Sequence, residues 1–199
     1  MKNRKRSLQI MLLAGAFSTF ALSCKQQQAN GADEASRGEV QTEESMAKTE
    51  NDSETNADQD FFSRVALTDL KEIEVGKLAQ QKRPNTPVSS FGKMLENDHT
   101  QSSAELKPLA NKAGVVLPTE PDAKAKQDKE KLQSLEGQEF DMQFATMMVQ
   151  GHNNAIALMK EIANNATDEN FRSWASGKIP VLQSHLKHAQ DLQNQVQKK

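Results

Sequence analysis

Four long stretches of this chain repeat apolar residues at the spacing of an α-helix. They span residues 58–83, 86–113, 137–166 and 168–196. At about 1.5 Å of rise per residue, helices of roughly 25–30 residues are about 37–45 Å long. Helices of that length bury their apolar faces most simply by packing side by side. The sequence therefore predicts an all-α fold built as a four-helix bundle.

Local signals place the helix ends and the connection between the two helix pairs. Thr86 and Pro87 suit the N-cap and first position of the second helix, and Gly114 suits its C-terminal stop. Pro108 predicts a kink or a break in the last turn of that helix. A short, polar helix over residues 122–135 follows and serves as a crossover. A crossover of this length allows the second and fourth helices to run in the same direction, as in ferritin-like bundles.

The first 23 residues have the layout of a secretory signal peptide. Basic residues between Lys2 and Arg6 precede an apolar stretch from Leu8 to Leu22. Cys24, the only cysteine, follows a small residue, as the lipidated cysteine of a bacterial lipoprotein does. We therefore expect lipidation of Cys24 and a place in the cell envelope, facing the periplasm or the exterior. The alternative is an ordinary cleaved signal with an incidental cysteine.

The segment after Cys24 differs from the rest of the chain. Residues 24–57 are acidic and contain almost no large apolar side chains, so they cannot bury enough surface to offset the entropy lost on ordering. We expect a flexible acidic linker over 24–57. We expect the helical bundle to occupy residues 58–197, with either Asp58 or Asp60 as the N-cap of its first helix.

Composition and motifs argue against several classes of function. The formal net charge is −2 and aromatic residues make up 5% of the chain, so neither a basic face nor a stacking platform for nucleic acid is expected. The domain has no cysteine, no Gly-x-Ser-x-Gly turn and no Gly-rich phosphate loop. Nucleophilic catalysis and nucleotide binding therefore find no support, and whether the protein is an enzyme stays open.

Ionisable side chains interrupt the apolar face of each long helix. At about 100° per residue, the apolar arcs contain Glu74 on the first helix, Asp98 and His99 on the second, Asp141 and His152 on the fourth, and His185 on the fifth. If the second and fourth helices run in parallel, Glu74 and the three histidines fall at similar depths. A buried ionisable group costs about 3–5 kcal/mol of stability unless it is paired or binds a metal.

Two interpretations of these residues remain open. In the first, Glu74, Asp98, His99, Asp141, His152 and His185 bind a transition metal such as iron, zinc, manganese or copper. In the second, they form a buried network that only fixes the fold of a non-catalytic envelope or stress-related binding protein. The Glu-x-x-His pair of di-iron bundles is absent from these helices. Met148 and Met159, near His152, suit either Cu(I) or flexible core packing.

Several segments together resemble one protein family. They are "EIEVGKLAQQK", "FGKMLENDHTQSSAELKPLANKAGVVLP", "LEGQEFDMQF" and "IPVLQSHLKHAQDL", in this order. Over about residues 59–194 the chain resembles the DUF4142 family of bacterial envelope proteins of unknown function. The resemblance implies a ferritin-like helical bundle and places the family's recurring polar positions at Glu72 or Glu74, Asp98, His99, Asp141, His152 and His185. Gly151 stands where the family usually has an aspartate before its second histidine.

Overall fold

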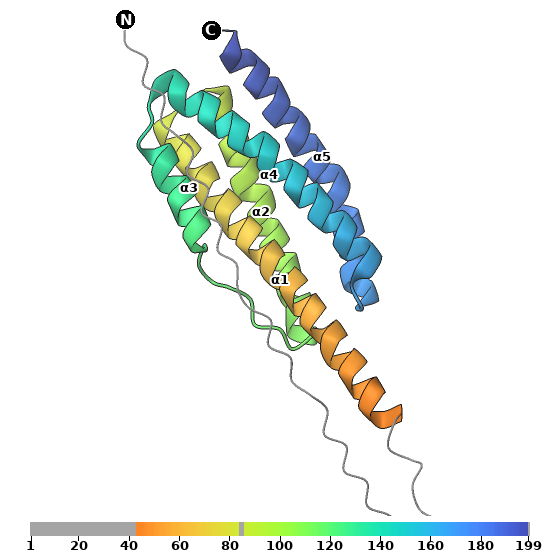
Figure 1. The fold of residues 1–199 in the computed structure, drawn as a ribbon. Coiled ribbons are helices and arrows are strands. Elements are labelled where there is room, and N and C mark those ends of the chain that lie inside the picture. The colour runs from red at the N-terminus through yellow and green to blue at the C-terminus, as the bar shows by residue number, and fades with distance from the viewer. Residues whose placement is uncertain (1–42, 84–85, 199) are drawn as a thin grey trace, which may run out of the picture. The chain divides into compact units, whose positions relative to one another are not determined.

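The computed structural model describes residues 43–83 and 86–198, with side chains from residue 57 onward (Figure 1). The described residues form five helices and no strand, so the all-α prediction is confirmed. The helices are α1 (Glu43–Lys82), α2 (Pro87–Lys112), α3 (Ala123–Gln133), α4 (Gly137–Asn165) and α5 (Glu169–Gln197). The predicted signal peptide, Cys24 and residues 25–42 of the predicted linker lie outside the described residues.

The directions of the long helices are those that the predicted crossover allows. In Figure 1, α1 and α5 run in one direction, and α2 and α4 run in the other. Two antiparallel hairpins, α1–α2 and α4–α5, therefore pack side by side. The short α3 joins them and lies along α1 and α4. This topology fits the ferritin-like arrangement, and all four long helices contribute to each of two buried hydrophobic clusters.

Most helix ends fall where the sequence places them. The Thr86 side chain accepts a hydrogen bond from the Ser89 amide, and Pro87 is the first residue of α2. Gly114 adopts a φ of 70°, the left-handed conformation that ends a helix at low cost for glycine. The helix α2 runs through Pro108 to Lys112, so the predicted break does not occur.

The start of α1 differs from the prediction. The helix begins at Glu43, inside the segment expected to be a linker through residue 57. Residues 43–48, "EESMAK", include Glu, Met, Ala and Lys, which favour a helix without needing a buried face. Asp58 consequently lies within the helix and is not its N-cap. Its buried carboxylate instead accepts hydrogen bonds from the Thr167 amide and hydroxyl, and so ties α1 to the α4–α5 turn.

The core follows a seam of buried residues on each long helix, spaced three or four apart and alternating over most of its length. On α1 the seam passes through residues 58, 62, 65, 69, 72, 76 and 79, all of which are buried. On α2 it passes through residues 88, 92, 95, 99, 102, 106 and 110. This is the spacing of helices that pack nearly parallel in bundles. The histidines at 99, 152 and 185 all lie on such seams.

Two glycines let α1 and α2 approach closely. A β-carbon added to Gly92 would lie 2.6 Å from the carbonyl oxygen of Gly76, and one added to Gly76 would lie 2.5 Å from that of Gly92. Both distances are well below van der Waals contact. The backbones therefore touch one or two turns from His99, which sets the separation of the helices that carry the polar residues.

The crossover helix α3 docks through ion pairs and two buried side chains. Lys71 on α1 donates to Asp128 (2.8 Å), and Lys129 donates to Glu74 on α1 (2.5 Å). Leu132 and Ala125 are buried beneath it. The helix thus covers the side of α1 that faces away from α2.

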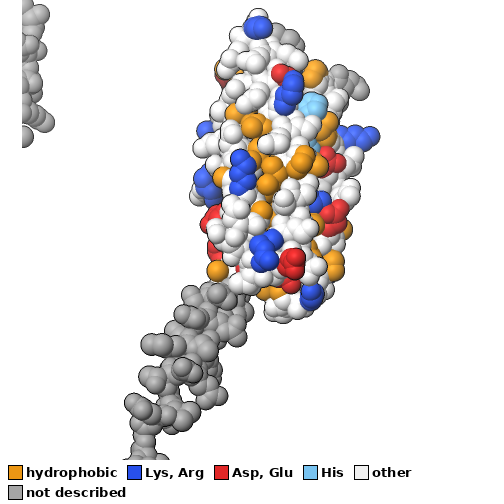
Figure 2. Space-filling model, turned by 90° about the vertical axis from the view of Figure 1, so that its right-hand side faces the viewer, with side chains coloured by type: hydrophobic (Ala, Val, Ile, Leu, Met, Phe, Trp, Pro, Cys, Tyr) orange, Lys and Arg blue, Asp and Glu red, His pale blue; other side chains and the backbone are white. Residues whose placement is uncertain are grey.

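The face of the molecule in Figure 2 is mixed in charge. The face in Figure 2 carries basic and acidic side chains interspersed with apolar ones, without a large patch of one sign. Among the described helices, none has both the length and the apolar character that crossing a bilayer requires.

Candidate metal centre

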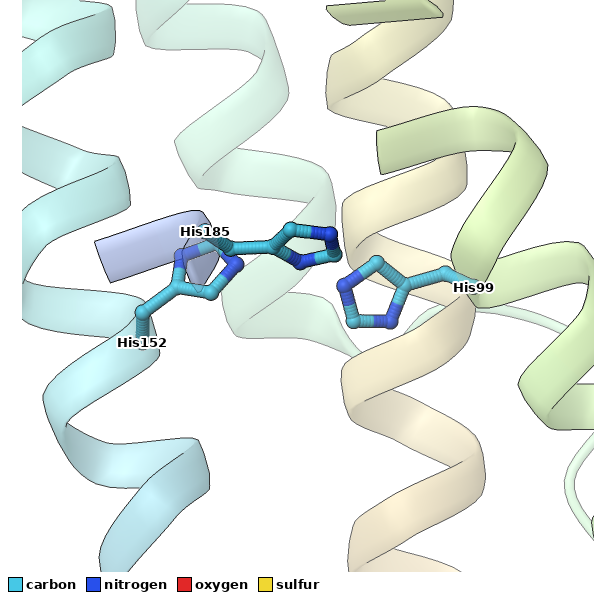
Figure 3. A group of neighbouring side chains, drawn as sticks. All are labelled: His99, His152 and His185. Carbon is cyan, nitrogen blue, oxygen red and sulfur yellow. The ribbon is translucent and has the colours of Figure 1, made fainter. Parts of the chain in front are cut away.

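Three histidines from three helices meet in the middle of the bundle. His99 on α2, His152 on α4 and His185 on α5 point their rings toward one another (Figure 3). Their ring centroids lie 5.2 Å apart for His152 and His185, 5.8 Å for His99 and His185, and 6.1 Å for His99 and His152. One ring nitrogen from each lies within 4.8 Å of the other two, and all three residues are buried. We call these residues the histidine cluster.

In each imidazole one ring nitrogen makes a hydrogen bond, and this bond orients the ring so that the other nitrogen faces the cluster. His99 donates from Nδ1 to Asp69 on α1 (2.7 Å), and His185 donates from Nε2 to Asp98 on α2 (2.8 Å). His152 donates from Nδ1 to the Met148 carbonyl one turn earlier (2.8 Å). Because the donating nitrogen carries the proton, the lone pair of each neutral ring lies on the opposite nitrogen.

The opposite nitrogens have no partner within the described part of the chain. His99 Nε2, His152 Nε2 and His185 Nδ1 are buried and make no hydrogen bond there. Buried polar atoms are nearly always paired, and each unpaired one costs about 1–3 kcal/mol. Three such atoms facing one another indicate a ligand that accepts three lone pairs.

Burial keeps two of the rings neutral. It lowers the pKa of His152 to about 4 and that of His185 to about 4. Burial also opposes a charge on His99, but the hydrogen bond to Asp69 and the nearby carboxylates outweigh it and raise the pKa of His99. His152 and His185 therefore have their lone pairs available across the neutral range.

Glu72 on α1 is the fourth unpartnered group. Its Oε2 is buried and finds no hydrogen-bond partner among the described residues. Burial raises its pKa, and the positive charges that His99 and His185 would carry oppose that rise. The carboxylate thus lies near two members of the histidine cluster, although its oxygens are not within the mutual 4.8 Å of the three ring nitrogens. A carboxylate here can bind a metal or balance its charge.

The glycine at position 151 makes room for this carboxylate. A β-carbon at Gly151 would lie 3.1 Å from Oε1 of Glu72, tighter than ordinary contact. The residue that departs from the family pattern thus contacts Glu72. From the sequence, Gly151 stands in place of an aspartate next to His152. In the structure, the space left by the absent side chain accommodates Glu72 of α1.

Three of the six predicted metal ligands come together. The predicted carboxylates lie elsewhere in the structure. His99, His152 and His185 form the cluster. Asp98 supports it from outside, since its side chain is 41% exposed and bonds to the far nitrogen of His185. Asp69, which sequence reasoning did not select, plays the same part for His99.

Glu74 and Asp141 do not join the histidines, which corrects the sequence-based placement. Glu74 is 35% exposed and pairs with Lys129 of α3. Asp141 pairs side-on with Arg83, with Nε and Nη2 lying 2.7 and 2.9 Å from its two oxygens. Both carboxylates are satisfied by cations. The large apolar residues of the first helix predicted that Glu74 lies on its buried face, whereas the buried seam of α1 contains Asp69 and Glu72.

The arrangement is chemically that of a cation site. Three imidazole nitrogens suit zinc, copper, iron and nickel, and His99 would bind the metal in its neutral form after giving up any second proton. Ring nitrogens bound to one tetrahedral metal at about 2.0–2.1 Å would lie about 3.4 Å apart, so binding would draw together these three, which lie within 4.8 Å of one another. Hydrogen bonds from metal-binding histidines to carboxylates or backbone carbonyls are the usual second layer of such sites.

Fold and cluster together define a helical-bundle protein with a buried, three-histidine candidate metal centre. The chain belongs to the DUF4142 family: the model described as "Domain of unknown function (DUF4142)" matches residues 41–192. The resemblance seen in the sequence is thus confirmed, and the match begins before the predicted edge of the bundle, close to the start of α1. No curated protein and no solved structure gives a significant match.

Proposed function

We propose that this protein binds a divalent transition metal through His99 Nε2, His152 Nε2 and His185 Nδ1. The observation that carries the proposal is that these three buried nitrogens face one another without partners among the described residues. Hydrogen bonds from the opposite ring nitrogens hold each lone pair in place. Glu72 supplies a carboxylate for the same metal, as a fourth ligand or as a counter-charge.

The charges around the cluster support a cation. Asp69 is almost fully buried, Glu72 is buried, and Asp98 lies at the edge. Carboxylates taken out of water need a positive partner. Burial holds two of the three imidazoles neutral, so His99 is the one member of the cluster that could offset part of that charge as a cation. A divalent ion between the rings would offset it.

The competing function is a non-catalytic binding protein whose polar core only fixes the fold. Such a network would stabilise the bundle through its own hydrogen bonds. Asp69–His99 and Asp98–His185 fit that role, because each joins two helices. The three unpartnered nitrogens and Glu72 Oε2 do not, since a network built for stability gains nothing from leaving them unsatisfied.

The test is metal analysis of the full chain and of two histidine variants. We expect the wild type to retain or take up close to one equivalent of zinc, iron, manganese or copper. His152→Ala should lose this metal and keep its helical circular dichroism. His188→Ala is the matched control, because His188 is exposed on α5 and bonds only to the Ser184 carbonyl.

Two outcomes would contradict the proposal. One is a wild type that takes up none of the four metals and melts identically with and without them. The other is a His152→Ala variant that binds metal as well as the wild type. If His152→Ala instead lowers the melting temperature with no metal to lose, the fold-fixing function is supported.

We further propose that the bundle works in the cell envelope, anchored to a membrane by lipid on Cys24. The support is the basic and then apolar N-terminal segment, which ends at the only cysteine. Incorporation of labelled fatty acid into the wild type, and its loss in Cys24→Ser, would test the anchor. Label retained in Cys24→Ser, or absent from both proteins, would contradict it.

A further inference from the structure

A small cavity adjoins the histidine cluster. His99 and His185 line it together with Asp69 and Asp98, and Val65, Ala155, Met159 and Leu182 supply most of its apolar wall. The cavity is partly open, and Val181 and Lys178 on α5 are among its lining residues. Val181 is 44% exposed, so it stands at the surface end. A path thus leads from the surface to two of the proposed metal ligands.

The size of the cavity limits what can reach the metal. The space open to the centre of a water molecule is about 40 Å³. A single water needs roughly 10–15 Å³ on this measure, so the cavity has room for about three small atoms. Pockets for organic substrates and cofactors are roughly 300–1,000 Å³, far larger than this one.

The ligand set leaves room for an outside molecule on the metal. Structural zinc sites have four protein ligands, whereas sites that bind a further molecule commonly have three and an open position. Here three imidazole nitrogens converge, and the Glu72 oxygens lie outside their mutual 4.8 Å range. The cavity borders His99 and His185, two of the three proposed ligands, but not His152, so a molecule within it would lie beside two of the rings that hold the ion.

The lining also favours neutral molecules over anions. Asp69 and Asp98 place two carboxylates at the cavity, and its only cationic side chain, Lys178, is already paired with Glu105 (2.5 Å). The carboxylates of Asp69 and Asp98 balance the two charges of a divalent ion, so the cavity offers an anion no excess positive charge. The apolar wall of Val65, Ala155, Met159 and Leu182 suits a molecule with little need for hydrogen bonds.

We propose that the metal centre keeps one coordination position open to this cavity, and that the cavity admits neutral inorganic molecules of two or three non-hydrogen atoms. Dioxygen and hydrogen peroxide belong to this class. The inference rests on the proposed metal site and deepens it, because it makes the bundle a small-molecule-binding metal centre that excludes organic substrates by size.

The experiment loads the full chain with cobalt(II) and adds nitric oxide without oxygen. Visible absorption and elemental analysis report cobalt uptake, which tests the metal site by itself. Nitric oxide is neutral and diatomic, and its binding would change the visible bands and abolish the half-integer spin signal of cobalt(II). We expect saturation at about one nitric oxide per cobalt. Pyridine, neutral but with six ring atoms, should leave the spectrum unchanged.

A pair of alanine variants tests the route through the cavity. Ala155→Val adds two methyl groups to the cavity wall, and we expect unchanged cobalt uptake with at least about tenfold weaker binding of nitric oxide. Ala66→Val is the matched control. Ala66 is equally buried, at 5% exposed, and belongs to the same apolar core, but it does not line the cavity.

Each other result decides against the inference. Cobalt uptake without nitric oxide binding means a closed metal site, and leaves the proposed metal function standing. Pyridine binding as tight as nitric oxide, or equal nitric oxide affinities in Ala155→Val and the wild type, means that the cavity does not control access. Failure to take up cobalt overturns both this inference and the metal site on which it rests.

Discussion

The Asp69 carboxylate lies 2.7 Å from Nδ1 of His99, and both side chains are almost fully buried where α1 faces α2. This bond joins the two helices of the first hairpin. It also fixes the ring orientation of His99, so that Nε2 faces His152 and His185. One hydrogen bond thus links the packing of α1 on α2 to the geometry of the candidate metal centre.

Asp69→Asn should weaken metal binding without abolishing it. The amide oxygen can still accept from His99, but it carries no charge, and the amide can turn to offer a donor instead. Loss of such a supporting carboxylate typically costs about 10–100-fold in metal affinity. Competition with a coloured chelator would measure the change.

Asp60→Asn is the control for that measurement, because Asp60 is on the same helix and pairs only with exposed Arg64. Its metal affinity should equal that of the wild type. If Asp69→Asn and Asp60→Asn bind metal equally well, Asp69 does not position His99.

The sequence correctly places the three histidines on buried helix faces, because they lie among large apolar neighbours. Leu95 lies four residues before His99, and Met148 lies four before His152, so the periodic pattern passes through the imidazoles. All five helices and most of their ends are likewise evident from caps and breakers. What the pattern lacks is the distance between helices, so it could not show that the rings meet.

The sequence misplaces the carboxylates of α1 for a physical reason. The buried seam of α1 contains Asp69, Glu72 and Gly76 at positions where an apolar residue is expected. Leu70 and Ile73, large apolar residues close to Glu74 on the helix, are only partly buried. The alternating spacing of three and four from Phe62 to Ala79 is the signal that could have selected Glu72 over Glu74.

Gly92→Ala should destabilise the bundle, whereas Gly177→Ala should stabilise it. A methyl group at Gly92 meets backbone of α1 that cannot swing aside, and such overpacking costs about 1–3 kcal/mol. A methyl group at Gly177 on α5 meets nothing within 4 Å, so the variant gains the helix preference of alanine, about 0.5–1 kcal/mol. Urea denaturation would measure both free energies of unfolding. Equal shifts of the two midpoints would show that the α1–α2 approach is not close.

Asp58→Ala should lower the free energy of unfolding by about 2 kcal/mol. The buried Asp58 carboxylate accepts from the Thr167 amide and hydroxyl and from the Asp168 amide, so the change leaves donors of the α4–α5 turn unsatisfied. Asp60→Ala is the matched control, two residues away and exposed, and should change the midpoint of chemical unfolding little. A loss no larger in Asp58→Ala than in Asp60→Ala would mean that α1 does not hold the turn.

The docking of α3 should depend on pH through Asp128. Burial opposes a charge on this carboxylate, but hydrogen bonds from Lys124 and Lys71 outweigh it and lower its pKa below the ordinary 3.8. A depressed carboxylate pKa stabilises the fold above the unfolded-state pKa, and that stability is lost as the pH falls through the folded-state pKa. Asp128→Asn should therefore cost about 1 kcal/mol at pH 7. The difference from the wild type should shrink below about pH 4.

Unfolding curves collected from pH 7 to about pH 3 would test this dependence. Asp191→Asn is the control, because Asp191 pairs with Lys187 one turn away on α5 and is 52% exposed. Its effect should stay small at every pH. A wild-type advantage over Asp128→Asn that persists unchanged in acid would mean that the ion pair with Lys71 does not hold α3 against α1. A stability difference from the wild type that shrinks in acid for Asp128→Asn and not for Asp191→Asn would show that the charge of Asp128 holds α3 against α1.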